Sequence, residues 1–159
     1  MTTDPTTPTR FRKAEQNFRW EGVEARPYKE DERALFKAVS RQILFSDPNL
    51  AGELRYFEVD AGGFSTLERH QHVHGVMIFR GRGHCLVGDA VREVGERDLV
   101  HVPPMTWHQF RATKGEPLGF LCMVDAVRDK PQLPTPADLA ALEANDEIAA
   151  FLRGTPRQS

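Results

Sequence analysis

Cysteine is scarce in this chain, long apolar runs are missing, and neither acidic nor basic residues are in clear excess. The 159 residues include two cysteines and carry a formal net charge of -2. No apolar run approaches the ~18–20 residues that cross a bilayer, which argues against a membrane protein. The small net charge gives no bulk attraction to nucleic acid or anionic lipid. We therefore expect neither a membrane nor a nucleic acid as a partner.

The amino-terminal residues also show no export signal. Met1–Arg10 are polar and lack the apolar centre of a secretory signal. We therefore expect a cytoplasmic protein in which Cys85 and Cys122 are free thiols. The same segment has little to bury, so a disordered tail is predicted over residues 1–10.

Short segments that mix apolar and polar residues in alternation fill the middle of the chain. Turns rich in glycine and proline separate them about every 8 to 12 residues, and no strand–helix–strand unit occurs among them. This spacing is typical of an antiparallel sandwich or barrel, so an all-β fold is predicted. Ala61–Gly63 are expected to interrupt the pattern. The predicted strands are Phe36–Phe45, Leu54–Val59, Phe64–Leu67, Val73–Phe79, Cys85–Val87, Ala90–Val94, Leu99–Val102, Trp107–Arg111 and Leu118–Val124.

The chain changes character after Asp125. Thr135 is a suitable helix N-cap, and Pro136 suits the first helical position. We predict one broken helix or two short helices over residues 136–152, with the break at Asn145–Asp146. The predicted organisation is a tail (1–10), an N-terminal extension (11–35), a barrel (36–126) and a C-terminal helical arm (127–159).

The histidines are concentrated in one part of the sequence. All six lie between residues 70 and 108, and three of them alternate. Side chains two apart on a strand project to the same face, so every second side chain from Glu68 to His74 is predicted to share one face. Burying these imidazoles and a carboxylate costs free energy unless a partner satisfies them. A divalent transition metal prefers such ligands, so the pattern predicts a metal site.

This region resembles the first motif of the cupin superfamily, G-x5-H-x-H-x3,4-E-x6-G. Counted back from Gly81, the two histidine positions of the motif fall on Glu68 and His70, and its glutamate falls on His74. The chain therefore exchanges one histidine and the glutamate, but keeps imidazoles and a carboxylate as donors. The resemblance implies a jelly-roll barrel of the double-stranded β-helix type, with short C-terminal helices added here.

A second segment resembles the other cupin motif, G-x5-P-x-G-x2-H-x3-N. Its proline and histidine align with Pro103 and His108. Two glycines and the asparagine of the motif are replaced, by Arg97, Met105 and Ala112. The resemblance implies that the lone histidine joins the first motif at one metal ion. The implied ligands are Glu68, His70, His74 and His108.

Two further residues are candidates for catalysis. His72 shares the predicted face of the ligands, so it either replaces Glu68 as the fourth ligand or acts as an acid or base beside the metal. Cys122 lies on the strand after the second motif, where it either presents sulfur to the site or packs as a small apolar side chain. Mixed nitrogen and oxygen donors suit manganese, iron, nickel, cobalt or zinc, and the residues do not choose among these metals.

Longer strings resemble the small bacterial cupins that accompany RubisCO-like proteins, a group that acts in methionine salvage. The resemblance implies an enzyme, a metal-dependent methylthiotransferase or sulfurylase with manganese as its metal. It implies transfer of the methylthio group of 1-methylthioxylulose 5-phosphate to glutathione, which yields 1-deoxyxylulose 5-phosphate. Cupins commonly dimerise, so a homodimer is expected. The strings are Phe36–Gln42, Ser65–Met77, Gly119–Val124 and Arg128–Pro134.

Two other functions fit the same residues. An iron-dependent cupin dioxygenase would bind oxygen at the metal, and a non-enzymatic cupin would hold a small ligand in its barrel. Methylthio transfer would also need a cation for the 5-phosphate of the substrate. The sequence does not single out that cation among Arg55, Arg69, Arg80, Arg111 and Lys130.

Overall fold

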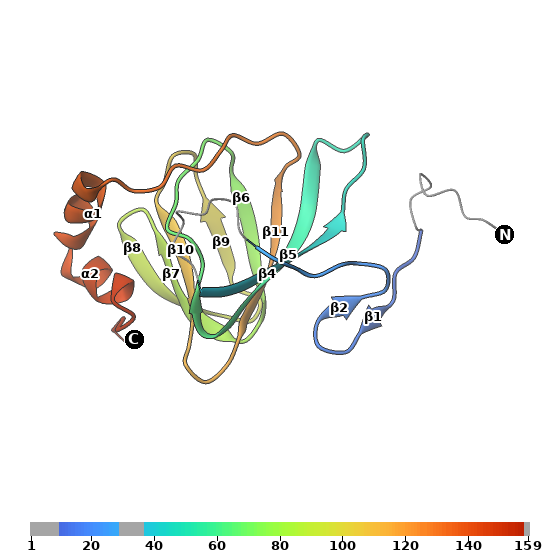
Figure 1. Cartoon of the computed structure of the whole chain (residues 1–159), viewed down its shortest axis with the longest axis horizontal. Coiled ribbons are helices and arrows are strands. Elements are labelled where there is room, and N and C mark those ends of the chain that lie inside the picture. The colour runs from blue at the N-terminus through green and yellow to red at the C-terminus, as the bar shows by residue number, and fades with distance from the viewer. Residues whose placement is uncertain (1–9, 29–36, 158–159) are drawn as a thin grey trace.

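A curled antiparallel sheet forms the body of the molecule (Figure 1). The computed structural model describes residues 10–28 and 37–157. Within these ranges the sheet has nine strands, and β1 (Ala14–Glu15) and β2 (Arg19–Trp20) pair separately. The sheet strands are β3 (Arg26–Pro27), β4 (Lys37–Phe45), β5 (Gly52–Phe64), β6 (His74–Arg80), β7 (Arg82–Val87), β8 (Ala90–Gly95), β9 (Leu99–Val102), β10 (His108–Ala112) and β11 (Leu118–Asp125).

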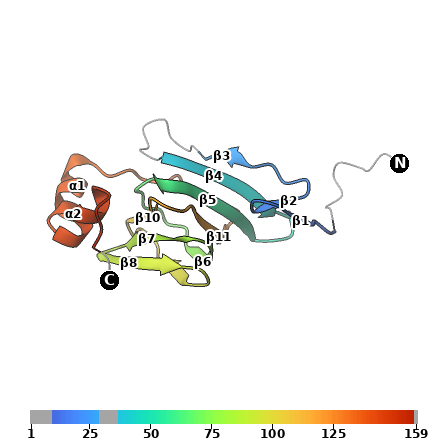
Figure 2. The same ribbon diagram turned by 90° about the horizontal axis from the view of Figure 1, so that it is seen from below.

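The long strand β5 connects the two halves of the sheet. Residues 52–59 of β5 pair with β11, whereas Phe64 at its end pairs with Arg111 of β10. The full order is β8-β7-β10-β5-β11-β6-β9, with β4 also paired to β5 and β3 to β4. Figure 2 shows β3, β4 and β5 in one layer and β6, β7 and β8 in the layer facing it. The interior therefore lies between two parts of one folded sheet.

Most of the predicted strands match observed ones, from β4 to β11, with ends that shift by a few residues. The prediction of a separate strand over Phe64–Leu67 is wrong, because Phe64 is the last residue of β5. Ala61–Gly63 do not interrupt this strand either. Gly62 adopts a φ of 71°, which lets the strand bend without ending, and its N–H donates to Thr113 O. Phe36 and residues 1–9 lie outside the described residues.

The core consists of inward side chains from alternate positions of several strands. Val59, Ile78 and Leu118 are fully buried, from β5, β6 and β11 respectively. The ring of Phe120 stacks on Phe57 at 5.6 Å and on Phe110 at 4.3 Å between centroids. The same alternation also determines which side chains of these strands face the interior at the end of the sheet opposite this apolar core.

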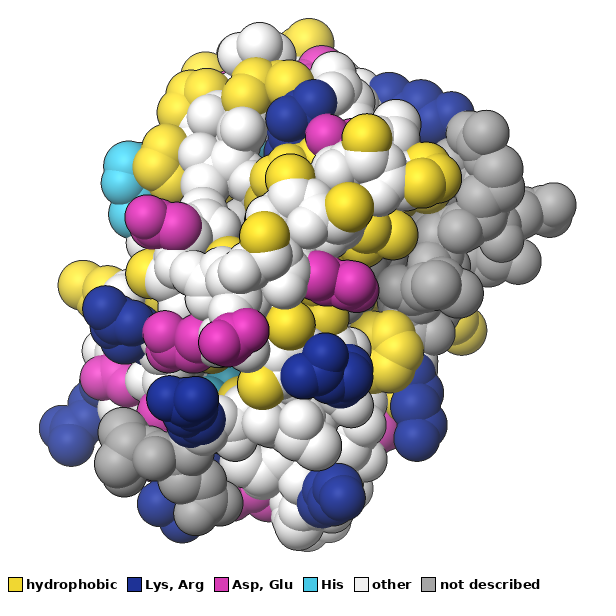
Figure 3. Space-filling model, turned by 90° about the vertical axis from the view of Figure 1, so that its left-hand side faces the viewer, with side chains coloured by type: hydrophobic (Ala, Val, Ile, Leu, Met, Phe, Trp, Pro, Cys, Tyr) yellow, Lys and Arg dark blue, Asp and Glu magenta, His cyan; other side chains and the backbone are white. Residues whose placement is uncertain are grey.

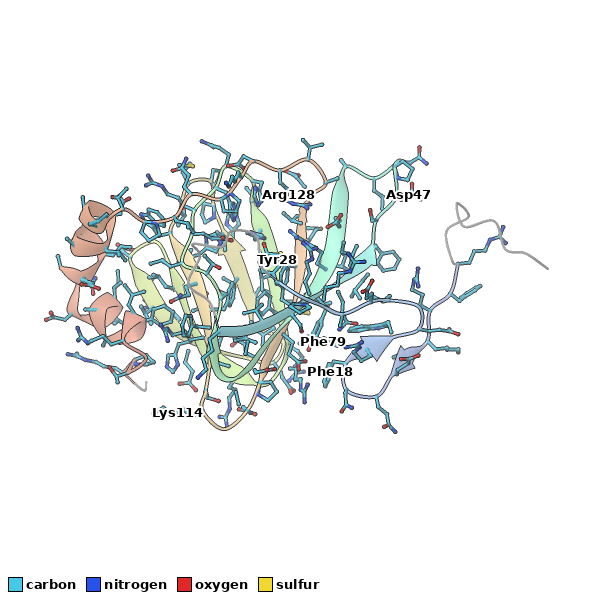
Figure 4. All side chains as sticks on the ribbon, in the orientation of Figure 1. Phe18, Tyr28, Asp47, Phe79, Lys114 and Arg128 are labelled. Carbon is cyan, nitrogen blue, oxygen red and sulfur yellow. The ribbon has the colours of Figure 1, made fainter. Side chains whose placement is uncertain are left out.

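The N-terminal residues pack against the outer face of β5 and β6. Phe18 meets the edge of the Phe79 ring at 5.8 Å (Figure 4). It also stacks on Tyr56 at 6.1 Å, and Trp20 contacts the same tyrosine ring at 5.3 Å. Tyr28, in contrast, packs against Phe57, whose ring belongs to the core. The described part of the N-terminal extension thus covers β5 with aromatic side chains.

Two short helices, α1 (Pro136–Glu143) and α2 (Asp146–Leu152), lie at one end of the sheet (Figure 1). Thr135 caps α1 through a capping box with Asp138, and Asn145 caps α2. The break therefore falls where the sequence predicts it. Phe151 of α2 packs in one apolar cluster with side chains of β7 and β8. Figure 3 faces this end and shows hydrophobic side chains scattered among acidic and basic ones. In the described ranges, neither helix has the length and apolar character needed to cross a membrane.

Candidate functional site

The histidine segment does not form the regular strand that its alternation predicts. Glu68 and Arg69 make isolated bridges to distant residues, the chain bends at 71–72, and β6 begins only at His74. The carboxylate of Asp129 accepts hydrogen bonds from the backbone N–H groups of Gln71 (2.8 Å) and His72 (3.0 Å). These bonds hold the bend and replace the ladder bonds of a strand. The side chains nevertheless converge.

Four imidazoles form a compact cluster inside the sheet. The ring of His70 lies parallel to that of His72, with 3.6 Å between centroids. It lies 4.6 Å from the ring of His74 and 4.8 Å from that of His108. His108, the first residue of β10, is joined to Glu68 by two backbone hydrogen bonds of 3.0 and 3.3 Å. The structure thus brings together all five residues that the two motifs and His72 contribute.

Hydrogen bonds to the Nδ1 atoms orient the rings. Nδ1–H of His70 donates to His72 O at 2.7 Å, and Nδ1–H of His108 donates to Thr106 O at 2.9 Å. Nδ1 of His72 lies 2.8 Å from Oδ1 of Asp129. A neutral imidazole that carries its proton on Nδ1 presents a lone pair on Nε2. The Nε2 atoms of His70 and His108 are therefore available as ligands.

The donor atoms fit a divalent cation. Nε2 of His74 lies 2.9 Å from Nε2 of His70, a contact that needs one hydrogen or one cation between the two nitrogens. One ligand atom from each of His70, His72 and His74 lies within 4.8 Å of the others, and the same holds for Glu68, His70 and His108. His70 belongs to both sets. Imidazole nitrogens with a carboxylate oxygen are ligands that transition metals prefer.

Burial keeps two of the imidazoles, those of His74 and His108, in the neutral form that binds metals. It lowers the pKa of His74 to about 2, helped by repulsion from His108 and the other rings. Burial likewise lowers the pKa of His108 to about 4. In contrast, the backbone N–H of Gln71 and the His72 ring hold the pKa of Asp129 well below its usual range. The cluster therefore combines the neutral rings of His74 and His108 with the ionised carboxylate of Asp129.

Cys122 lies behind His74 rather than in front of it. Its Sγ is 2.8 Å from Nδ1 of His74, whereas Nε2 of that ring faces His70. The side chain is fully buried, and burial raises the pKa of its thiol to about 12. Cys85 is also buried, but in apolar surroundings where its Sγ lies 3.7 Å from Leu86 O. The two free thiols are thus in different settings, since Cys122 contacts His74 and Cys85 packs in the apolar core.

Asp129 is the residue that sequence reasoning missed. It contacts His72 from 57 positions further along the chain. No spacing rule links a lone aspartate in the C-terminal segment to a bend between two histidines. The contact forms because β11 ends at Asp125 and brings the following residues back to the histidine segment.

A curled antiparallel sheet with a histidine cluster inside one end is the architecture of a cupin barrel. The family model described as cupin domain matches residues 55–124, and the chain belongs to the cupin family. A curated relative from Rhodospirillum rubrum is 62% identical over 144 residues, which cover 91% of this chain and 92% of the relative. That relative is 1-methylthio-D-xylulose 5-phosphate methylsulfurylase.

Two solved structures resemble the whole described fold. A cupin 2 conserved barrel domain protein from Rhodopseudomonas palustris has a TM-score of 0.84 and 60% identity, covering 89% of this chain and 97% of its own. A cupin-2 domain protein from Rhodospirillum rubrum has the same TM-score and identity, covering 92% and 99%. The predicted all-β cupin fold and the predicted resemblance are confirmed. The expectation of an enzyme is confirmed as well, because the curated relative is one.

Proposed function

We propose that this chain is a metal-dependent enzyme that removes the methylthio group of 1-methylthioxylulose 5-phosphate. Glutathione accepts the group, and 1-deoxyxylulose 5-phosphate remains. The observation that carries the proposal is the convergence of His70, His74 and His108 in a chain 62% identical to a methylsulfurylase. The proposal places the reaction in methionine salvage in the cytoplasm, and includes a homodimer as the working form.

The proposed metal ligands are those of the two motifs. Glu68, His70, His74 and His108 would hold the cation, with His72 as the alternative to Glu68. Manganese is the proposed metal, although iron, nickel, cobalt and zinc suit the same donors. When bound, the cation supplies positive charge to the substrate carbonyl oxygen, where negative charge develops as the neighbouring carbon–sulfur bond breaks.

The transfer itself needs a thiol and a proton donor. The glutathione sulfur attacks the methylthio sulfur, and a sulfur–sulfur bond forms while the carbon–sulfur bond breaks. The electron pair of the broken bond stays on the sugar carbon, which takes up one proton as glutathione loses one. His72 is the proposed acid and base, because Asp129 holds its Nδ1 and leaves Nε2 for proton transfer.

Cys122 is the second candidate for the acceptor of the methylthio group. In that case a mixed disulfide on Cys122 precedes release by glutathione. Intact-mass spectrometry after incubation with substrate but without glutathione separates the two routes. An added methylthio group that is absent from the Cys122→Ala variant assigns the acceptor to the protein. An unmodified chain with turnover fully dependent on glutathione assigns direct transfer.

The proposed reaction is tested with purified, manganese-loaded protein, the methylthio sugar phosphate and glutathione under argon. We expect 1-deoxyxylulose 5-phosphate and the mixed disulfide of glutathione in equal amounts. Iron in the protein with oxygen-dependent turnover would instead favour a dioxygenase. A chain that binds the sugar phosphate but forms no product, with any of the metals named above, would favour a ligand-binding cupin.

A further inference from the structure

Arg55 carries a buried charge that its neighbours satisfy only in part. This β5 residue is 1% exposed, and its Nε and Nη1 atoms make no hydrogen bond within the described part of the chain. Arg55 forms an ion pair with Glu53, whose Oε1 lies 3.5 Å from Nε of the arginine. Burying a guanidinium without matched acceptors costs free energy, which a bound anion would offset.

Among the described residues, the charged groups around Arg55 have a net positive charge. Oε1 of Glu53 also lies 3.6 Å from Nη1 of Arg128, so two guanidinium groups share one carboxylate. Other close neighbours of Arg55 are the ring of Phe57, 5.2 Å from the guanidinium carbon, the protonated thiol of Cys122 and the side chain of Tyr28. Two cations and one carboxylate leave one positive charge. Such a pair of guanidinium groups suits a phosphate, which accepts several charge-assisted hydrogen bonds.

The register of the sheet places this charge beside the histidine cluster. Arg55 of β5 is paired with Cys122 of β11, so both side chains project to the same interior face. Cys122 in turn contacts His74. Figure 4 shows Arg128 at the end of the barrel where the chain leaves β11 for the C-terminal segment. An anion bound to Arg55 and Arg128 would therefore lie next to the candidate metal site. Only β11 separates β5, which carries Arg55, from β6, which carries His74.

The three other arginines considered from the sequence are less suited. Arg69 donates to the Gln132 side chain, and Arg80 pairs with Glu58 at 2.9 Å. Arg111 lies three positions after His108 on β10, so its side chain points to the opposite face of the strand. It also donates to Leu152 O at 2.8 Å. None of these three combines a position inside the sheet with unpaired nitrogens in the way Arg55 does, as far as the described residues show.

We propose that Arg55 and Arg128 bind the phosphate group of the substrate. This inference rests on the proposed function, which requires a phosphorylated sugar, and it assigns the phosphate contacts that the sequence leaves open. The phosphate would anchor one end of the sugar at β5 while the carbonyl end lies at the histidine cluster. Specificity for a phosphomonoester over the free sugar would then come from this pair.

Calorimetric titration of manganese-loaded protein tests the site directly. The probes are inorganic phosphate and 1-deoxyxylulose 5-phosphate, with unphosphorylated 1-deoxyxylulose as the comparison. We expect Arg55→Met to weaken binding of both phosphate compounds about 10- to 100-fold, and Arg128→Gln to weaken it by a smaller factor. Affinity for the unphosphorylated sugar should stay within about twofold. Arg82→Met, which removes an exposed cation paired with Glu116, is the matched control and should leave all three affinities unchanged.

Thermal melting and kinetics keep the outcomes separate. Arg55→Met should melt no lower than the wild type, because it removes a poorly paired buried charge. If that variant does not fold, the partly exposed Arg128 supplies the test. Phosphate binding that depends on Arg55, without any methylthio transfer by the wild type, would overturn the proposed reaction and keep the anion site. Normal turnover with an unchanged KM in both variants would overturn the anion site and keep the reaction.

Discussion

The two ends of the barrel interior are built by the same strands but differ in what those strands carry. β6 begins with His74 and carries the buried Ile78 four positions further on, and β10 begins with His108 and carries the buried Phe110 two positions further on. Because side chains two positions apart on a strand share a face, both residues of each pair face the interior. Along each strand the inward side chains therefore change from candidate metal-donor histidines to apolar residues. At the apolar end the strands keep their ladder pairing, with a register shift between Gly119 and Phe120, whereas the donor end is bent at 71–72.

This difference shows how the fold supports groups that are costly to bury. Val59, Ile78 and Leu118 are fully buried and hold the strands in register. The donor end departs from regular structure, as functional sites commonly do. The comparison predicts that changes at the donor end alter ligand binding with little loss of stability, and that changes at the apolar end do the reverse.

Removal of a central donor should have the largest effect on function. His70→Ala should lower manganese affinity and activity by more than about 100-fold, because His70 belongs to both candidate ligand sets. Elemental analysis and steady-state rates measure the loss. His101→Ala, which removes an exposed histidine of β9, is the control and should behave like the wild type. A His70→Ala protein that keeps its full metal content would contradict the assignment.

At the apolar end, truncation should lower stability by several kcal/mol. Ile78→Ala leaves a cavity at a site with no solvent exposure, so we expect a loss of about 2–5 kcal/mol in the free energy of unfolding. Urea denaturation measures it. Manganese affinity of the folded fraction should change less than about twofold, because His74 lies at the other end of the strand. A loss of metal affinity as large as that of His70→Ala would break the division between the two ends.

Asp129 should have an intermediate effect, confined to the donor end. Asp129→Asn keeps the shape but removes the charge that faces the His72 ring and two backbone N–H groups. We expect a loss of about 10- to 100-fold in activity or manganese affinity. Asp125→Asn, an exposed change at the end of β11, is the matched control. Equal kinetics of the two variants would show that Asp129 holds the bend but does not position His72.

The smallest effect is expected at a backbone position that departs from the cupin motif. Arg97 replaces a motif glycine yet keeps a φ of 73°, in the left-handed region that favours glycine. Arg97→Gly should therefore raise the free energy of unfolding by up to ~1 kcal/mol. Glycine removes the backbone strain of the left-handed conformation, and this gain exceeds the cost of the extra conformational entropy that glycine loses on folding. Arg92→Gly, within β8, should lower it. A lower stability for Arg97→Gly would mean that the side chain contributes more than the strain.

Much of the donor end could be predicted from the sequence, because its residues come from motifs with fixed spacing. The meeting of His108 with His70 and His74 follows from the barrel that those motifs imply. The local path from 68 to 73 does not follow, since Asp129 holds that bend from a distant segment. The unpaired nitrogens of Arg55 were equally beyond prediction, because they depend on which acceptors other strands bring near.

At the apolar end, alternation and turn residues predicted the strands well, since one buried face with period two gives a regular signal. The failure at Phe64–Leu67 has a local cause. Glycine in Ala61–Gly63 suggests a turn, but at Gly62 it serves a bend inside a strand that keeps its partners. Local composition therefore does not distinguish a break in β5 from a change of direction.

The proposed function depends most on one cation held between the imidazoles of two distant segments. A crystal structure of the protein prepared with manganese, with anomalous scattering measured at a wavelength specific for that metal, tests this directly. We predict one strong anomalous peak within coordination distance of Nε2 of His70, His74 and His108. A manganese-loaded crystal whose anomalous peak lies elsewhere, with these three nitrogens joined only by hydrogen bonds, would contradict it.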